Sequence, residues 1–373
     1  MRIAFDVSYV QRRRAGYGRL STELLSALLK ADDKNEYILH GWSCSIDFET
    51  LRQFQRPNVQ MNVKRIPGNI KRWYWTRAQF PPIEYFVGSV DVFHSADPFL
   101  PPVRSAKKIS TVHDLASTKF PEFFESDVLR MNKHIGQHVA SADAIIVPSE
   151  HTKLDLGELN AVDPKKVTVI REPVSPIFSE RGDPENDDAI VKRFGIVNAY
   201  ALFVGTFEPR KNIASIVKAF NLLGDTEGLH LVLVGKKGWK YDDVFRLIND
   251  SPSKMRIHYL EFVTDEELAV LYRKSLFFVY PSFYEGFGLP VLEAMASGTP
   301  IITSNTSSLR ELADGVALLV DPQRVNDLVE AMSMLANDEV RRVEMRQRGA
   351  YVSRQFTAEA AAKAIQALYK SLV

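Results

Sequence analysis

Short apolar runs alternate with amphipathic stretches along most of this chain. The runs are apolar on both faces, which is typical of buried parallel strands, and the stretches between them have helical periodicity. The alternation is most regular in the second half of the chain. The strands predicted there cover 200–205, 230–235, 256–262, 276–281, 300–304 and 317–320. We therefore expect a parallel sheet with helices on both faces.

The first half shows the same alternation less regularly. Its predicted strands cover 2–8, 37–43, 90–94, 108–113, 144–149 and 167–171. Helical patterns cover 19–29, 128–141 and 151–156, and an amphipathic helix, 357–372, closes the chain. Strand–helix alternation in both halves predicts an α/β fold with two doubly wound, Rossmann-like domains and right-handed crossovers.

The length of 373 residues also favours two domains, because one hydrophobic core rarely grows beyond about 250–300 residues. The segment 173–188 contains three prolines and a charged DPENDD run, which predicts an interdomain linker. We place the domains at 1–178 and 179–356, followed by a terminal helix over 357–373. In the second domain, Thr264 and Glu267 have the spacing of a helix capping box.

The composition is that of an ordinary soluble protein, with 45% apolar and 25% charged residues. The net charge of +1 gives no electrostatic reason to expect nucleic-acid binding. Cys44 is the only cysteine, so no internal disulfide can form, and we expect a small buried side chain in a reducing cytosol. Asp6 lies where a signal peptide would be apolar. No apolar run approaches the ~20 residues that span a bilayer, so we expect a cytoplasmic protein.

The most informative chemistry lies in SFYEGFGLPVLEAMASG, which follows the predicted strand 276–281. Gly286 and Gly288 form a turn that leads into a helix, and glycine allows close approach of the backbone to a ligand. The N-terminus of that helix suits an anion. Glu285 and Glu293 bracket the turn, and their carboxylates can accept hydrogen bonds from sugar hydroxyls. The alternative is an ordinary strand–turn–helix with surface glutamates.

A second motif, GTFEPRKN, follows the strand 200–205. Arg210 and Lys211 stand side by side after Gly205, and together they can neutralise a diphosphate. Taken alone, the pair could equally be two solvated basic residues in a loop. However, both motifs lie past the carboxyl ends of predicted strands, where open α/β sheets bind ligands.

These motifs, together with TSNTSSLRELADGVALLVDP, resemble the carboxyl half of family 4 of the retaining glycosyltransferases, whose two-domain fold is called GT-B. The resemblance is specific over 201–322 and looser over the first half. It implies two Rossmann-like domains facing a cleft, with the terminal helix crossing back onto the first domain.

The resemblance also implies roles for individual residues. Arg210 and Lys211 would bind the diphosphate of a nucleotide-sugar donor, with Gly205 beside them. Glu285 would approach the donor sugar, and Glu293 would accept hydrogen bonds from the ribose. The backbone of the turn would also approach the sugar, and the base would be held near 261–263. These backbone contacts come from Val263, Gly286, Phe287, Gly288 and Leu289.

Gly16 and Gly18 lie between the first predicted strand and the first helix. A dehydrogenase fingerprint is disfavoured because Ser21 replaces the third glycine, and the second strand does not end in an acidic residue. In the resembled family, a glycine loop at this place opens toward the donor phosphates and the acceptor. The three arginines at 12–14 are either a solvated basic patch or a contact for an acceptor phosphate.

His113 ends the apolar strand ISTVHD, again at a carboxyl end. It could donate to a sugar hydroxyl, or it could be a structural histidine with satisfied partners. The resemblance implies a histidine here that approaches the donor sugar. A further cluster, KRWYWTR at 71–77, suits burial, a membrane interface or stacking on an acceptor sugar.

No D-x-D triplet occurs, and the eight histidines show no paired zinc spacing, so we expect neither a metal nor another cofactor. The predicted function is metal-independent transfer of a hexose, with retention, from GDP-mannose or a UDP-hexose. The expected acceptor is a polysaccharide or lipid-linked oligosaccharide, with peripheral membrane contact as an open question. Two alternatives remain: a nucleotide-sugar epimerase of the same fold, and a non-catalytic sugar-nucleotide binding protein.

Overall fold

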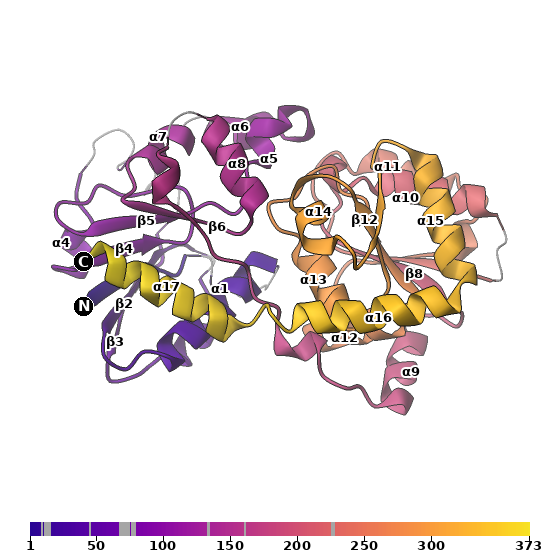
Figure 1. Ribbon diagram of the computed structural model, residues 1–373, viewed down its shortest axis with the longest axis horizontal. Helices are drawn as coiled ribbons and strands as arrows, with labels where there is room; N and C mark the ends of the chain where they lie inside the picture. The colour runs from indigo at the N-terminus through magenta and orange to yellow at the C-terminus, as the bar shows by residue number, and fades with distance from the viewer. Residues whose placement is uncertain are drawn as a thin grey trace. The chain divides into compact units, whose positions relative to one another are not determined.

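The computed structural model describes residues 1–8, 10, 16–44, 46–66, 75, 80–132, 135–159, 162–224 and 228–373. Contacts divide the chain into two compact units (Figure 1). Unit 1 consists of Met1–Leu115, Met131–Pro173 and Phe356–Val373, and unit 2 consists of Ala116–Arg130 and Val174–Gln355. The segment 116–130 therefore groups with unit 2, although the residues on either side of it in the sequence belong to unit 1.

Unit 1 contains a seven-stranded parallel sheet with the order β3-β2-β1-β4-β5-β6-β7. Its strands are β1 (Arg2–Asp6), β2 (Glu36–Trp42), β3 (Val59–Lys64), β4 (Val92–Ser95), β5 (Lys107–Thr111), β6 (Ala144–Val147) and β7 (Val167–Val169). The six strands predicted for this half are confirmed. The sequence analysis missed β3 because it looked for continuous apolar runs, whereas this half-buried edge strand, VQMNVK, alternates apolar and polar residues.

Helices cover both faces of this sheet. They are α1 (Gly16–Lys30), α2 (Phe48–Arg52), α4 (Glu84–Val87), α7 (Ile135–Ala140), α8 (Glu150–Glu158) and α17 (Ala358–Leu372). Alternate residues of β1 enter different cores: Ile3 and Phe5 pack with α1 and α17, whereas Ala4 packs in the core that contains α7 and α8. Burial on both faces explains why the strands are continuous apolar runs.

The terminal helix α17 lies beside α1 within unit 1 (Figure 1). Thr357 caps it by accepting from the backbone N–H of Ala360. Near its other end, the buried Tyr369 hydroxyl lies 2.7 Å from Nδ1 of His94, whose Nε2 lies 3.0 Å from Thr111 Oγ1. Burial lowers the pKa of His94 to about 3. His94 is therefore neutral at physiological pH and joins the helix to β4 and β5.

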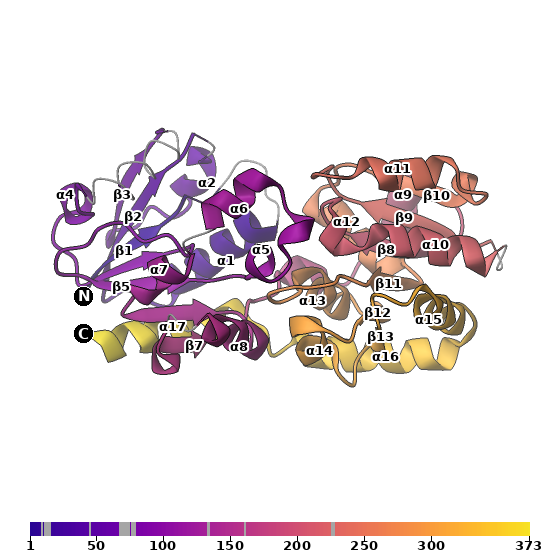
Figure 2. The same ribbon diagram turned by 90° about the horizontal axis from the view of Figure 1, so that it is seen from above.

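Unit 2 contains a six-stranded parallel sheet with the order β10-β9-β8-β11-β12-β13 (Figure 2). Its strands are β8 (Tyr200–Val204), β9 (His230–Val234), β10 (Ile257–Leu260), β11 (Phe277–Tyr280), β12 (Ile301–Ser304) and β13 (Leu318–Val320). All six confirm the predicted strands. The order reverses between β8 and β11, so unit 2 has a topological switch point between these two neighbouring strands.

The helices of unit 2 alternate with its strands, as predicted. They are α9 (Pro184–Arg193), α10 (Ile213–Leu223), α11 (Asp242–Asn249), α12 (Asp265–Lys274), α13 (Leu289–Ala296), α14 (Ser307–Ala313), α15 (Val325–Asn337) and α16 (Glu339–Ser353). The predicted capping box is confirmed, because Thr264 and Glu267 each bond the other's backbone N–H at the start of α12.

The prediction of a linker over 173–188 is wrong for its second part. The DPENDD run begins helix α9, where Asp183 caps the first turn. Asp187 is buried and forms a two-pronged ion pair with Arg273 of α12 at 2.9 and 3.0 Å. Acidic residues favour a helix N-terminus as well as a solvated loop, so the charge run alone could not distinguish the two.

Two further expectations concern the surface. Cys44 is exposed rather than buried, because it lies in the turn just past the carboxyl end of β2. Trp75 of the KRWYWTR cluster is buried, with its ring 5.3 Å from that of Trp42 and 6.1 Å from that of Phe99. The other residues of that cluster lie outside the described residues, as do the three arginines at 12–14.

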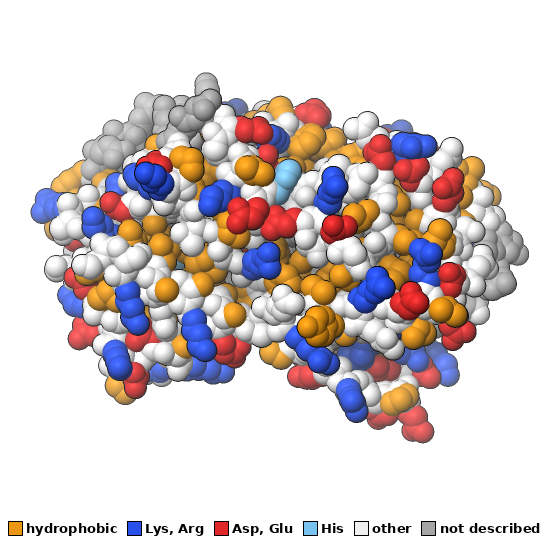
Figure 3. Space-filling view, viewed as in Figure 1, with side chains coloured by type: hydrophobic (Ala, Val, Ile, Leu, Met, Phe, Trp, Pro, Cys, Tyr) orange, Lys and Arg blue, Asp and Glu red, His pale blue; other side chains and the backbone are white. Residues whose placement is uncertain are grey.

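On the face drawn in Figure 3, acidic and basic side chains are interspersed over both units, in keeping with the near-zero net charge. Among the described residues, no helix combines the length and apolar character that a bilayer crossing requires.

The buried His94 predicts a pH dependence of stability. Its pKa in the folded state, about 3, lies below the ordinary 6.5. The unfolded chain therefore takes up a proton first, and stability falls as the pH drops from about 6.5 toward 3. We expect the free energy of unfolding, measured by urea titration, to fall less steeply over this range in His94→Gln than in wild type. Equal slopes would contradict the burial argument.

Candidate functional site

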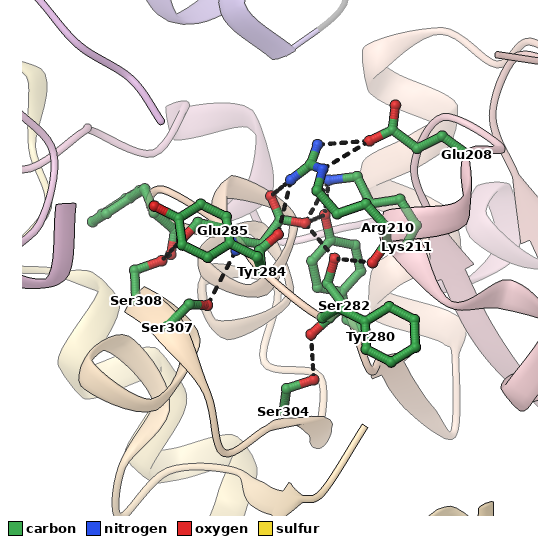
Figure 4. A network of polar contacts seen from close by, with 12 residues as sticks. Glu208, Arg210, Lys211, Tyr280, Ser282, Tyr284, Glu285, Ser304, Ser307 and Ser308 are labelled. Atoms are coloured by element: carbon green, nitrogen blue, oxygen red, sulfur yellow. Dashed lines mark hydrogen bonds and ion pairs between the residues drawn. The ribbon is translucent and has the colours of Figure 1, made fainter. Parts of the chain in front are cut away.

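Two loops meet at the switch point of unit 2. The first follows β8 and contains the short 3₁₀ turn η5 (Pro209–Lys211), and the second runs from β11 to α13 (Figure 4). Asn212 holds the first loop in place in a left-handed conformation, with φ of 57°. Its side-chain amide donates to the carbonyls of Pro281 and Pro322, so it ties the turn to the ends of β11 and β13.

Arg210, Lys211 and Glu285 form a buried ion cluster between these loops. Lys211 Nζ lies 2.6 Å from Glu285 Oε1, and Arg210 Nη1 lies 2.8 Å from Glu285 Oε2. The guanidinium also pairs with Glu208 at 2.7 Å and donates to the carbonyl of Tyr284 at 2.9 Å. The side chains of all three cluster members are about nine-tenths buried. Sequence motifs separated by some 75 positions are thus brought into direct contact.

Hydroxyl groups complete the surroundings of Glu285. Tyr280 and Ser282 both donate to its Oε1, at 3.0 and 2.6 Å. The backbone is held as well: the N–H of Glu285 donates to Ser307 Oγ, and Ser308 Oγ donates to the carbonyls of Glu285 and Phe287 (Figure 4). The carboxylate therefore has a fixed orientation before any ligand binds.

Burial and the charges of this cluster shift the pKa values of its members and of Tyr280. Burial alone raises the pKa of Glu285, but Arg210 and Lys211 outweigh it and bring the pKa down to about 2. Burial and the nearby charge of Arg210 lower the pKa of Lys211. Burial and the negative charge of Glu285 raise the pKa of Tyr280 well above its usual range. Glu285 is therefore ionised and Tyr280 protonated at neutral pH.

The glycine turn that follows Glu285 is tightly packed. Gly288 has a φ of +112°, which residues with a side chain rarely adopt, and a Cβ added there would lie 2.7 Å from the side chain of Leu309, which would have to shift. Gly288 is also the N-cap of α13 and contributes no capping side chain. Gly286 and Phe287 are buried in the turn, and Leu289 is the first residue of the helix. These are the positions predicted to approach a ligand through their backbone.

The remaining predicted residues of unit 2 are Gly205, Val263 and Glu293. Gly205 follows β8 directly, and Val263 lies past the end of the edge strand β10. Glu293, on α13, is buried and accepts a hydrogen bond from the Tyr272 hydroxyl at 3.0 Å. Its predicted contact with a ribose would have to coexist with this bond or replace it.

In unit 1, His113 has protein partners on both ring nitrogens. Nδ1 lies 3.0 Å from Glu172 Oε1, and Nε2 lies 3.2 Å from the carbonyl of Ala96. Burial alone would lower the pKa of His113, but Glu172 outweighs it and raises the pKa. Gly16 is the first residue of α1, and the carbonyl of the buried Gly18 accepts from Thr22 in the same helix.

His113 also lines a pocket of unit 1 at the carboxyl ends of β4, β5 and β6. Most of the lining is apolar and comes from the sheet, α1 and α17. Its polar members are Ser21, His94, Thr111, His113, Arg171 and Glu172. The pocket thus combines an apolar floor with a few groups able to bond hydroxyls.

The sequence analysis missed three residues of the ion cluster's surroundings: Glu208, Tyr280 and Ser282. Glu208 lies inside the TFEPRKN motif, but from the sequence alone an acidic residue at this position cannot be distinguished from an ordinary loop residue. Tyr280 and Ser282 flank the end of β11, and their position beside Glu285 at a strand end was the only signal that could have found them. Within the described part of the chain, no group of three or more His, Cys, Asp or Glu side chains is arranged to hold a metal.

Comparisons with known proteins agree on the class of this chain. Residues 15–176 match the model of Glycosyltransferase Family 4, and residues 189–356 match the model of Glycosyl transferases group 1. O-antigen chain mannosyltransferase B of Escherichia coli is 29% identical over 96% of this chain and 97% of its own length. An O-antigen chain mannosyltransferase of Salmonella typhimurium is 30% identical over 57% of this chain and 56% of its own.

Solved structures show the same fold. Sucrose-phosphate synthase from Thermosynechococcus elongatus superposes with a TM-score of 0.80 at 20% identity, covering 100% of this chain and 99% of its own. Anabaena HepE in complex with UDP-glucose gives 0.76 at 16% identity, with both chains fully covered. WaaG, a glycosyltransferase involved in lipopolysaccharide biosynthesis, gives 0.73 at 13% identity, covering 97% of this chain and 98% of its own.

The ion cluster predicts an acid-sensitive contribution to stability. The pKa of Glu285 is about 2 in the folded state, below the ordinary 4.5. The contribution of the ionised Glu285 to the free energy of unfolding is therefore complete above about pH 4.5 and is lost as the pH falls toward 2. We expect wild type to be more stable than Glu285→Gln at pH 6, and the difference between their free energies of unfolding to shrink between pH 4.5 and 3. A difference that stays constant over this range would show that the carboxylate is not held by the two cations.

Proposed function

This chain belongs to family 4 of the glycosyltransferases and has the GT-B fold, and we propose that it transfers mannose from GDP-mannose, with retention and without a metal, to a saccharide acceptor. Its activity as a hexosyltransferase follows from the family. The donor, the stereochemistry and the acceptor are the proposal. The observation that carries it is the buried contact of Arg210 and Lys211 with Glu285 at the switch point of unit 2.

The cluster suits a nucleoside diphosphate because it places two fixed cations at one strand end. Arg210 offers a planar fork of donors and Lys211 a compact charge. Glu285, which pairs with both cations, and Glu208, which pairs with Arg210, together balance their charge in the ligand-free protein. A bound diphosphate would supply that charge instead and leave the carboxylate able to accept bonds from sugar hydroxyls. Tyr280 and Ser282, which donate to Glu285, would keep it oriented during this exchange.

The strand order of unit 2 suggests where the nucleoside part of the donor would lie. The residues proposed for the base follow β10, which lies two strands from β8 in the sheet. Adjacent strands are roughly 4.8 Å apart, so the two strand ends are separated by about 10 Å. That spacing suits a nucleoside lying across the carboxyl edge, with its phosphates beside Arg210. The UDP-glucose complex of HepE, which has the same fold, supports a nucleotide-sugar donor.

Mannose is proposed because both relatives described above are named O-antigen chain mannosyltransferases. The same names support a growing polysaccharide or a lipid-linked oligosaccharide as the acceptor. A UDP-hexose remains the competing donor. The pocket of unit 1 is proposed for the acceptor, since Ser21 and Arg171 in its lining could bond its hydroxyls.

The proposed reaction breaks the bond between the anomeric carbon and the diphosphate oxygen. Negative charge builds on the diphosphate, where Arg210 and Lys211 stabilise it. The acceptor oxygen forms its bond to the anomeric carbon on the same face, and the departing phosphate oxygen takes the acceptor proton. No side-chain base is required, and with two fixed cations on the leaving group we propose that none of the charge is carried by a metal.

Donor choice can be tested by thermal unfolding. A ligand that binds only the folded protein raises the melting temperature by mass action. We expect GDP and GDP-mannose to raise it more than UDP and UDP-glucose at equal concentrations, without added metal. A larger shift with the UDP ligands would change the proposed donor, and no shift with any of the four would contradict the nucleotide site.

The diphosphate role can be tested with Lys211→Ala. Losing one preorganised donor at developing charge typically lowers turnover about 10²–10³-fold, so we expect a fall of that order in hexose transfer. Lys274→Ala is the matched control, because Lys274 is a more exposed lysine of the same unit that also pairs with a carboxylate, that of Asp188. The control should retain wild-type turnover. Near-native turnover in a folded Lys211→Ala protein would rule out the proposed role.

A further inference from the structure

The segment 116–130 groups with unit 2, whereas the rest of the chain before residue 174 groups with unit 1. It contains α5 (Ala116–Lys119), the 3₁₀ turn η2 (Pro121–Phe123) and the start of α6 (Ser126–Asn132). Three of its aromatic residues, Phe120, Phe123 and Phe124, contact loops of unit 2. We call the stretch from Phe120 to Phe124 the aromatic strap. Its contacts fall on two loops that follow strands of the unit 2 sheet.

One side of the strap is fixed to the loop after β9. The indole N–H of Trp239 donates to the carbonyl of Phe123 at 2.6 Å, and Lys240 Nζ donates to the carbonyl of Glu122 at 2.8 Å. The ring of Phe124 lies 5.7 Å from that of Trp239. Two side-chain donors on consecutive residues therefore hold the backbone of the strap in a defined position.

The other side of the strap packs on the loop after β11. The ring of Phe123 is stacked on that of Phe283, with centroids 5.3 Å apart and planes inclined by 21°. The ring of Phe120 lies 5.5 Å from that of Tyr284. Tyr284 is buried, so its ring has a fixed environment of which Phe120 is part.

Phe283 and Tyr284 are the residues that hold Arg210. The backbone N–H of Phe283 donates to the carbonyl of Arg210 at 2.9 Å. The carbonyl of Tyr284 accepts from Arg210 Nη1, also at 2.9 Å. Both the backbone and the guanidinium of Arg210 are thus bonded to two consecutive residues, and the rings of those two residues are covered by the strap.

We propose that Phe120 and Phe123 are positioning residues for the diphosphate site: they fix the Phe283–Tyr284 loop and, through it, the direction of the Arg210 guanidinium. This inference rests on the proposed nucleotide-sugar function. The strap does not touch the reacting atoms. It acts because transition-state stabilisation requires donors that are already aimed, and a misplacement of about 1 Å remote from the chemistry can cost on the order of 10² in rate.

The contacts of the strap also explain a cluster of phenylalanines in the sequence to which the proposed function assigns no role. The segment DLASTKFPEFFES follows the predicted strand 108–113, and its three phenylalanines within five residues have no counterpart elsewhere in the sequence. Such a cluster in a loop would be expected to expose apolar surface. Its pairing with Phe283, Tyr284 and Trp239 gives each ring an aromatic partner.

A double-mutant cycle tests the proposal. Tyr284→Ala removes the ring that Phe120 contacts but keeps the carbonyl that Arg210 uses. The probes are GDP and UDP, titrated separately into wild type by calorimetry, and the tighter of the two is then used with Phe120→Ala, Tyr284→Ala and the double variant. We expect each single variant to weaken binding about tenfold and the double variant to be little weaker than Tyr284→Ala alone. Phe120→Tyr, which keeps the ring, should restore binding to near the wild-type value.

Two further variants complete the experiment. Trp239→Phe keeps an aromatic ring but removes the N–H that fixes the strap, so it should weaken binding in the same direction by a smaller factor, and it serves in place of Phe120→Ala if that protein fails to fold. Tyr351→Ala is the control, because Tyr351 is an exposed aromatic residue on α16 of the same unit.

The outcomes separate this inference from the function on which it rests. Wild type that binds neither GDP nor UDP would overturn the nucleotide site, and the role of the strap with it. Wild type that binds normally would overturn the strap proposal alone if Phe120→Ala and Trp239→Phe bind equally well. Fully additive losses in the cycle, or a Phe120→Tyr protein as weak as Phe120→Ala, would also overturn it, because either result would show only a general loss of structure.

Discussion

Two cations and one carboxylate, buried together at the switch point of unit 2, are the constraint on which the rest of the site depends. Isolated charges in such a place would be strongly disfavoured, and removing one partner of a buried pair typically costs about 3–5 kcal/mol. Arg210, Lys211 and Glu285 therefore have to be held in one arrangement by their neighbours. The hydroxyls of Tyr280 and Ser282, and the carboxylate of Glu208, supply the remaining partners.

In the proposed function, this arrangement makes the ligand-free protein a preorganised receptor for negative charge. The cations would not have to be assembled when the proposed diphosphate binds, because Glu285 already holds them in place. The carboxylate serves as an internal substitute for the ligand, and the depressed pKa of Glu285 expresses the same attraction. Fixed side chains of this kind can meet the charge of a leaving group without a metal, and the function proposed for this chain is based on that possibility.

The two units are built from interleaved parts of the chain. The terminal helix α17 completes the core of unit 1 through Tyr369 and His94, far from its neighbours in sequence. The segment 116–130 instead packs on the loops of unit 2 that surround Arg210. Neither arrangement changes the α/β class of the fold. Both decide which side chains surround the candidate residues, and the proposed role of the strap would let a segment outside the Arg210 and Glu285 motifs act on them.

The sequence by itself determined the repeating architecture and the principal charged residues, because buried parallel strands require continuous apolar runs and ligand groups follow their carboxyl ends. Twelve strands were predicted from that signal, whereas the half-buried edge strand β3 gave too little of it. Only the tertiary structure decided that Glu285 pairs with both Arg210 and Lys211, that His113 is bonded to Glu172, and that Cys44 is exposed. Those outcomes depend on which loops come together in the folded protein, and a local sequence pattern does not show which loops these are.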